Sequence, residues 1–172
     1  MTPDEMIRLL GLAPLPQEGV YYRETYRTPL VLPSAGLPDC YHGDRNASTA
    51  IYFLLTPEEN SALHILPTDE VFHFYSGDAV QMLLLYEEGT VERPTLGVDL
   101  ARGERPQVVA PGGAWQGCRL ADGGRFALLG CTVAPGFDFR DFHVATHEET
   151  IQLAARFPDA AEEIHRLAPA KP

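Results

Sequence analysis

The sequence predicts an all-β domain of the jelly-roll kind with short helices at its two ends. Between residues 20 and 144, aromatic, β-branched and alternating segments follow one another, bounded by Gly, Pro and Asp. No helical pattern separates these segments, which favours a sandwich or barrel over a parallel α/β sheet. At 172 residues, we expect a single domain over 1–172.

The first predicted element is a short N-terminal helix. Thr2-Pro3-Asp4-Glu5 is a capping box with Pro at the first helical position, and Gly11 ends this short helix. With a Pro- and Gly-rich entry loop, this N-terminal region covers 1–19. The barrel covers 20–144, with a long loop over 27–47. Strands are expected near 20–26, 48–56, 62–66, 70–75, 79–87, 91–100, 106–110, 114–121, 124–134 and 138–144.

A second capping box begins the C-terminal helices, expected over 146–168. Thr146 caps a helix through about Phe157, Pro158 breaks it, and a last helical segment runs through Leu167. Helices at both ends of the chain can cover open barrel edges or a partner subunit.

Composition excludes several classes of function. The net charge of -11 and the pI of about 4.8 argue against nucleic-acid binding, which needs a concentrated positive surface. No apolar run is long enough to span a membrane, and the N-terminus is acidic where a signal peptide would be basic. The three cysteines have no C-x-x-C spacing, so we expect neither a disulfide framework nor a zinc site. A cytoplasmic protein is predicted.

Two spaced motifs resemble those of the cupin superfamily. In the first cupin motif, His-x-His is followed by Glu and Gly, and here His64, Leu66, Glu70 and Gly77 stand at those positions. In the second motif, Gly precedes Pro-x-Gly-x-x-His. Gly103 is followed, after seven residues, by Pro111-Gly112-Gly113-Ala114-Trp115-Gln116, so Gln116 replaces the last His.

The chain is further similar to the fifth cupin family, a domain of unknown function that carries the same substitutions. The resemblance implies a cupin double-stranded β-helix, an RmlC-like jelly-roll barrel. One departure matters: the family block His-Pro-Glu-Gly-Gly reads Pro16-Gln17-Glu18-Gly19-Val20 here, so the roles of that His and second Gly are not carried over. The matching blocks lie at 19–27, 48–55, 69–74, 111–116 and 130–139.

Alternation along the strand over 70–75 places Glu70, Phe72 and Phe74 on one face. The resemblance implies that this face points into the barrel. A carboxylate between two Phe side chains would be partly desolvated and would need a partner. His64 is that partner in our interpretation, with Gln116 entering from the second motif as a ligand-binding amide. The alternative is an internal hydrogen-bonded pair without a function.

Further side chains are candidates for the ligand site. Tyr22 and Tyr52 are candidate acids, and with Trp115 they could line the cavity mouth, although aromatic residues on strands are more often core residues. Arg23, like Arg27 on the same strand, could clamp a carboxylate or phosphate or pair on the surface. Asp138 could orient a residue of the cavity or cap a turn.

We predict that no metal or other cofactor is required. If a divalent metal bound, His64, Glu70 and Gln116 would be its ligands, but an amide oxygen is a weak ligand and the second His position holds Leu66.

Three functions remain open from the sequence. The first is a metal-independent isomerase or epimerase acting on a sugar or sugar nucleotide, with His64 as base, oriented by Glu70, and Tyr22 or Tyr52 as acid. The second is a non-catalytic module that binds a small polar metabolite, and the third is a weakly metal-dependent oxygenase or lyase. The predicted partners are a small-molecule ligand and a second copy of the chain, with contact near 20–27, and neither nucleic acid nor membrane.

Overall fold

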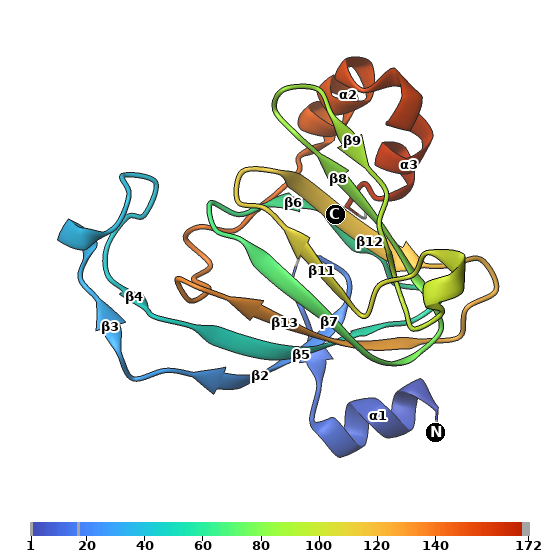
Figure 1. The fold of residues 1–172 in the computed structure, drawn as a ribbon, viewed down its shortest axis with the longest axis horizontal. Coiled ribbons are helices and arrows are strands. Elements are labelled where there is room, and N and C mark those ends of the chain that lie inside the picture. The colour runs from blue at the N-terminus through green and yellow to red at the C-terminus, as the bar shows by residue number, and fades with distance from the viewer. Residues whose placement is uncertain (1, 17, 170–172) are drawn as a thin grey trace.

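The computed structural model describes residues 2–16 and 18–169 and shows two sheets that face each other (Figure 1). Every pairing between strands is antiparallel, as in a jelly roll. The first sheet has the order β1(Ala13–Pro14), β2(Tyr21–Arg27), β5(Thr49–Leu55), β13(Ala127–Val133), β7(Glu70–Gly77) and β11(Gln107–Ala110). The second has the order β10(Thr95–Leu96), β8(Val80–Leu85), β12(Trp115–Leu120), β6(Ser61–Ile65) and β14(His143–Val144), with β9(Val91–Glu92) beside β8.

The inner faces of the two sheets supply one hydrophobic core. Alternate residues of each strand point inward, so Phe53 and Phe72 of the first sheet meet Met82 and Cys118 of the second. Phe53 and Phe72 pack edge to face, with ring centroids 6.1 Å apart. Phe53 belongs to this core and also lines a cavity, so the cavity adjoins the packed core.

Helices cover the outer faces of both sheets. The N-terminal helix α1(Pro3–Leu10) has the expected capping box and packs Met6 against Leu54 on the outside of the first sheet. The C-terminal α2(His147–Arg156), the 3-10 turn η3(Pro158–Ala160) and α3(Ala161–Arg166) cover Leu83 and Leu85 on the outside of the second sheet (Figure 1). Among the described residues, no helix combines the length and apolarity that crossing a bilayer requires.

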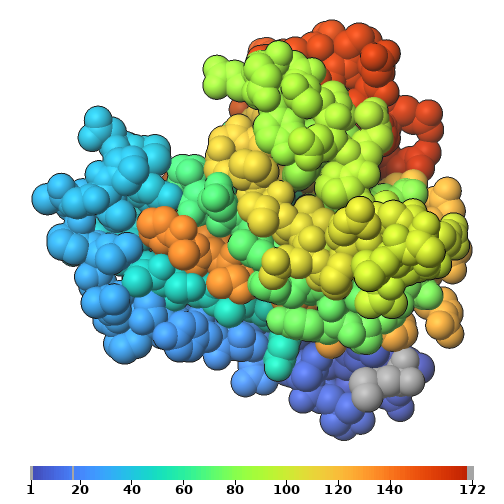
Figure 2. Space-filling view, in the orientation of Figure 1, coloured from blue at the N-terminus to red at the C-terminus, as the bar shows by residue number. Residues whose placement is uncertain are grey.

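An arm projects from the barrel between β2 and β5. It contains β3(Val31–Leu32), the 3-10 turn η1(Ser34–Gly36) and β4(Arg45–Asn46), with β3 and β4 paired as a separate two-stranded sheet. Figure 2 shows the arm as a lobe at the left edge, with the orange segment near residue 140 against it. The expected loop over 27–47 is therefore partly ordered by this pairing.

Two predicted strands are largely wrong. The segment 91–100 is interrupted at Pro94, which cannot donate to a ladder, and it forms the short β9 and β10 followed by the 3-10 turn η2(Leu100–Arg102). The segment 138–144 is extended only at β14. Before β14 the backbone is not extended, and the side chains of Asp138 and Asp141 bind Arg140 and Arg45.

Candidate functional site

The turns of the two motifs pack directly against each other. Gly112 N–H donates to Asp69 Oδ1 (2.8 Å), and Gly113 N–H donates to Leu66 O (2.8 Å). A Cβ at position 112 would clash with the carbonyl oxygen of Pro67, so this approach requires Gly. The contact sets the register in which β12 pairs with β6 and places Gln116 opposite His64.

His64 lies at the inner end of the open cavity between two carboxylates. Its Nδ1 lies 2.8 Å from Ala62 O, and because a carbonyl only accepts, Nδ1 carries a proton. Glu18 Oε1 lies 3.9 Å from Nδ1, and Glu70 Oε2 lies 3.9 Å from Nε2. The second distance is too long for a direct hydrogen bond. Nε2 is therefore free to donate to a group that enters the cavity.

Glu18 is the site residue that the sequence reasoning missed. The loop before β2 packs against the start of β6, where Ala62 N–H donates to Glu18 O (3.0 Å) and the Ser61 hydroxyl donates to Glu18 Oε1. The side chain is only 4% exposed. A signal existed: Glu18-Gly19 is the part of the first family block that this chain retains, and an unpaired Glu in an otherwise apolar loop needs a partner.

Glu70 and Gln116 form a buried hydrogen-bonded pair. Gln116 Nε2 donates to Glu70 Oε2 (2.9 Å), and this fixes the orientation of the amide, since the reverse would place two acceptors together. Gln116 Oε1 is buried and has no hydrogen-bond partner among the described residues. The structure thus brings His64, Glu70 and Gln116 together from both motifs. Gln116 itself does not line the cavity, so it contacts Glu70 rather than the space expected to hold a ligand.

The electrostatics of this cluster favour a protonated imidazole. Burial opposes the charge, but the attraction of Glu18 and the interaction with Glu70 outweigh it and raise the pKa of His64 to about 9. Burial also raises the pKa of Glu18, against the opposing effects of His64 and the Ser61 hydrogen bond. At neutral pH, His64 therefore holds a proton that it can donate through Nε2.

We expect the free energy of unfolding to fall as pH rises through this range. Because the folded pKa of His64 exceeds its ordinary value of 6.5, its contribution is full below pH 6.5 and is lost toward pH 9. The raised pKa of Glu18 also makes the free energy of unfolding fall as pH rises above 4.5, because the folded state holds the proton more tightly. Urea unfolding should show a loss on the order of 2 kcal/mol between pH 6.5 and 8.5.

The His64→Gln variant should lack most of this slope, whereas the same substitution at the exposed His165 should keep it. Staying below pH 8.5 limits the contribution of the buried thiols of Cys118 and Cys131, whose pKa values burial raises above the ordinary 9.0. A slope unchanged by His64→Gln would contradict the assignment of the proton to this ring.

The cavity has a volume of about 480 Å³ and apolar walls above the polar inner end. Phe142 lies against the imidazole of His64, with ring centroids 5.1 Å apart, and Phe137 and Phe139 pack around it. Such a cavity, apolar with a few convergent polar groups, is typical of a small-molecule site. Its lining residues are Leu15, Glu18, Tyr22, Glu24, Arg27, Thr49, Ile51, Phe53, His64, Leu66, Glu70, Cys131, Val133, Phe137, Asp138, Phe139 and Phe142.

A β-bulge decides which residues of β2 face the cavity. Tyr22 and Glu24 line it, but the pairing with β5 shifts after Glu24, so that Arg27 rather than the parity-related Tyr26 follows them inward. Arg23 points outward, and its Nη1 donates to Leu10 O (2.8 Å) at the end of α1. Arg23 therefore does not line the cavity, so the expectation that it binds a ligand there is wrong. Arg27 lies in the cavity wall instead.

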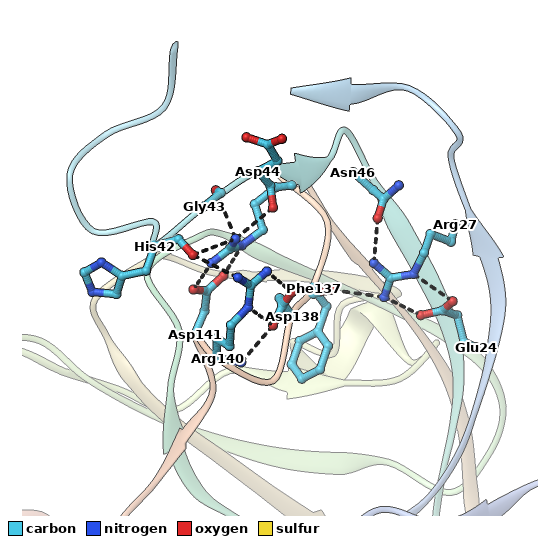
Figure 3. Close-up of polar contacts among 11 residues, drawn as sticks. Glu24, Arg27, His42, Gly43, Asp44, Asn46, Phe137, Asp138, Arg140 and Asp141 are labelled. Carbon is cyan, nitrogen blue, oxygen red and sulfur yellow. Dashed lines mark hydrogen bonds and ion pairs between the residues drawn. The ribbon is translucent and has the colours of Figure 1, made fainter. Parts of the chain in front are cut away.

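Charged pairs at the rim tie the arm to the loop after β13 (Figure 3). Arg27 donates through Nε and Nη2 to Glu24 and through Nη2 to Phe137 O (3.0 Å). Asp138 lines the cavity and accepts from Arg140 Nε (2.9 Å) and Nη2 (2.7 Å), which holds the pKa of Asp138 well below its usual range. Asp138 Oδ1 also accepts from the backbone N–H of Arg140 (2.9 Å), so Asp138 caps this turn, one of the two roles expected for it.

Four predicted lining residues lie elsewhere. Tyr52 faces α1 on the outside of the first sheet and packs against Tyr75. Trp115 faces the C-terminal helices and lies 5.7 Å from the His143 ring. Phe72 and Phe74 share the inward face of Glu70 as expected but belong to the packed core rather than to the cavity lining.

The residues present do not fit a cupin metal. Within the described part of the chain, no group of three or more His, Cys, Asp or Glu side chains is arranged to hold an ion. Leu66 presents an apolar side chain at the second His position, and Gln116 turns its N–H toward Glu70 rather than its oxygen toward His64.

Comparisons with known proteins agree with the motifs. The model of the family Cupin_5, described as "Cupin superfamily (DUF985)", matches residues 4–145. An uncharacterized protein of Saccharomyces cerevisiae, YML079W, is 31% identical over 160 residues, covering 88% of this chain and 79% of the relative.

Solved structures share the fold. A hypothetical protein from Leishmania major has 34% identity and a TM-score of 0.84, covering 99% of this chain and 100% of that one. Protein SO0799 from Shewanella oneidensis has 33% identity and a TM-score of 0.83, covering 99% of each chain. A cupin 2 domain-containing protein from Halorhodospira halophila, at 14% identity and a TM-score of 0.57 over 92% of this chain and 88% of that one, shares the fold alone.

Proposed function

This chain belongs to Cupin_5, a family of the cupin superfamily, and from that premise we propose that its barrel binds a small polar molecule and transfers a proton to or from it without a metal. The observation that carries the proposal is the position of His64, buried between Glu18 and Glu70 at the inner end of a cavity of about 480 Å³. Buried titratable groups that converge in a cavity are enriched at functional sites.

The reaction type that fits is isomerisation or epimerisation next to a carbonyl, as on a sugar. Glu70 takes the proton from the carbon beside the carbonyl, and His64 Nε2–H donates its proton to the carbonyl oxygen, which yields a neutral enol. Return of both protons, one to carbon and one to His64, regenerates the site. The sequence predicted His64 as the base and Glu70 as the residue that orients it. Here His64 is the acid and Glu70 the base, because a ring with a pKa of about 9 is protonated at neutral pH.

Tyr22 is the remaining candidate for a second acid. It lies on β2 in the sheet that faces His64, and it lines the cavity. Epimerisation needs proton delivery to the opposite face of the substrate, which Tyr22 could provide. Tyr52, on the outer face, cannot reach a substrate in this cavity.

The test has two steps. Native mass spectrometry of the purified protein should detect a co-purifying small molecule, and that molecule should be absent from Leu66→Trp, in which the cavity is filled. Incubation of this molecule with the protein in D2O should then introduce deuterium at carbon, as followed by NMR. Binding without exchange would instead support the non-catalytic module.

Elemental analysis of untagged protein should show well under one equivalent of transition metal.

We also propose a homodimer formed through β2 and the arm. β1 pairs only with Tyr21 and Tyr22, so the rest of this edge of β2 has no partner among the described residues, and Tyr26, Leu30 and Val31 are exposed beside it. Light scattering at micromolar protein should give twice the chain mass of 18.9 kDa, and Val31→Asp should lower that value. A monomer mass for the unmodified protein would contradict this proposal.

A further inference from the structure

The ionisable groups that line the cavity are mainly acidic. Glu18, Glu70, Glu24 and Asp138 supply four carboxyl groups, whereas the basic groups of the lining are His64 and Arg27. Glu18 and Glu70 flank His64 at the inner end, and the other two carboxylates lie at the rim. Arg27 and Arg140 pair with the two rim carboxylates, Glu24 and Asp138. The carboxyl groups without an arginine partner are therefore Glu18 and Glu70, beside His64.

The basic groups are already used by the protein. Arg27 donates Nε and Nη2 to Glu24, Nη1 to Asn46 Oδ1 (3.0 Å) and Nη2 to Phe137 O (Figure 3). Little of this guanidinium remains to bind a phosphate or carboxylate of a ligand. His64 uses Nδ1 for Ala62 O, which leaves one N–H, at Nε2, directed at the cavity.

The carboxylates, in contrast, keep free acceptor capacity. Glu18 Oε1 accepts from Ser61, and Glu70 Oε2 accepts from Gln116. Within the described residues, the second oxygen of Glu18 accepts no hydrogen bond, and the Glu70 carboxylate lies beside the Cys131 thiol, a weak donor. An ammonium group carries three donors and no acceptor, so it matches these oxygens. The aromatic walls formed by Tyr22 and Phe142 suit the rest of such a ligand, since aromatic faces also attract cations.

We infer that the cavity selects a small organic cation, a polar molecule that carries a protonated primary amine on a ring-sized body, over its neutral and anionic analogues. The inference rests on the proposed function in one respect, that this cavity is the ligand site. It narrows the substrates considered from sequence, because the phosphates of a sugar nucleotide would lie against the carboxylates of Glu18 and Glu70 without a free guanidinium to bind them.

Three probes with the same indole body separate charge from shape: tryptamine is a cation, tryptophol is neutral and indole-3-acetate is an anion. Titrations should be followed by calorimetry and by NMR shifts of the His64 ring. We expect tryptamine to bind at least tenfold more tightly than indole-3-acetate, with tryptophol between them. Glu18→Gln and Glu70→Gln, which preserve shape, should each reduce this ratio. Glu58→Gln, which removes the same charge from an exposed turn, should not.

Equal affinities for the three probes, or tighter binding of the anion, would overturn the charge selection and leave the proposed site in place. Absence of binding by all three probes at 10 mM, on the order of the weakest useful affinity, would also overturn it. Neither result bears on the deuterium exchange of a co-purified ligand, which tests the proposed function independently. A ratio unaffected by Glu18→Gln and Glu70→Gln would place the selectivity outside this cavity and would equally overturn the inference.

Discussion

Replacing His64 with Gln is expected to lower the rate of deuterium exchange into the bound ligand by a factor of about 10² to 10⁴, the usual contribution of a positioned acid or base. Gln keeps a donor near the position of Nε2 but cannot deliver a proton. The ring is 3% exposed, and its Nε2 lies 3.9 Å from Glu70 Oε2, a gap that a substrate oxygen can bridge. Loss of rate should therefore exceed loss of affinity.

The control is Tyr52→Phe, which changes an aromatic side chain on the outer face of the same sheet and should leave exchange unchanged. Circular dichroism checks that the His64 variant is folded. If it is not, Glu70→Gln serves instead, because the new amide can still accept from Gln116 Nε2 while it can no longer take a proton. Exchange within twofold of the unmodified protein in a folded variant would reject proton transfer by this pair.

Replacing Arg45 with Met is expected to lower the free energy of unfolding by about 3 to 5 kcal/mol, the usual cost of breaking a buried ion pair from one side. The side chain is only 2% exposed. It binds Asp141 through Nε (2.7 Å) and Nη2 (2.5 Å) and donates Nη1 to the carbonyls of Gly43 (3.0 Å) and Asp44 (2.8 Å) (Figure 3). Met would leave the carboxylate and these carbonyls unpaired.

The matched control is Arg93→Met, which removes an equally well-formed pair with Glu163 at the surface. Because both side chains are more than a third exposed, water screens the interaction, and its loss should cost about 1 kcal/mol or less. Denaturant unfolding of the two variants measures the difference. If Arg45→Met costs no more than Arg93→Met, the pair does not clamp the arm to the loop after β13.

The Arg45–Asp141 ion pair also positions one wall of the cavity. Asp141 is followed by Phe142, whose ring lies against His64. We therefore expect Arg45→Met to weaken ligand binding in the folded fraction, because the cavity wall loses the attachment that positions it. In this way a residue outside the cavity affects the site through packing.

Elements that depend on local chemistry could be predicted from the sequence. The capping boxes at Thr2 and Thr146 begin helices because a side-chain oxygen satisfies free backbone N–H groups wherever such a segment occurs. Alternation between the two sheet faces likewise marked most of the strands. Motif spacing brought His64, Glu70 and Gln116 into one site, because the glycine turns of both motifs fix the register of their strands.

Alternation could have corrected one prediction made from sequence. Trp115 and Gln116 are neighbours in β12, and neighbours in a strand point to opposite faces. Once Gln116 is placed inside the barrel, Trp115 must lie outside, where the C-terminal helices cover it. Tyr22 and Arg23 are likewise neighbours in β2, so Tyr22 faces the cavity and Arg23 faces outward.

The rest of the site depends on tertiary contacts that no single segment encodes. Glu18 joins His64 because the loop before β2 packs against β6; the retained Glu18-Gly19 marked the residue, but no local pattern encodes its contact with His64. Arg27 reaches the cavity because a bulge after Glu24 inverts the alternation of β2, which depends on the pairing with β5. The charge on His64 then follows from burial beside two carboxylates, a property of distances between strands rather than of the sequence along any one of them.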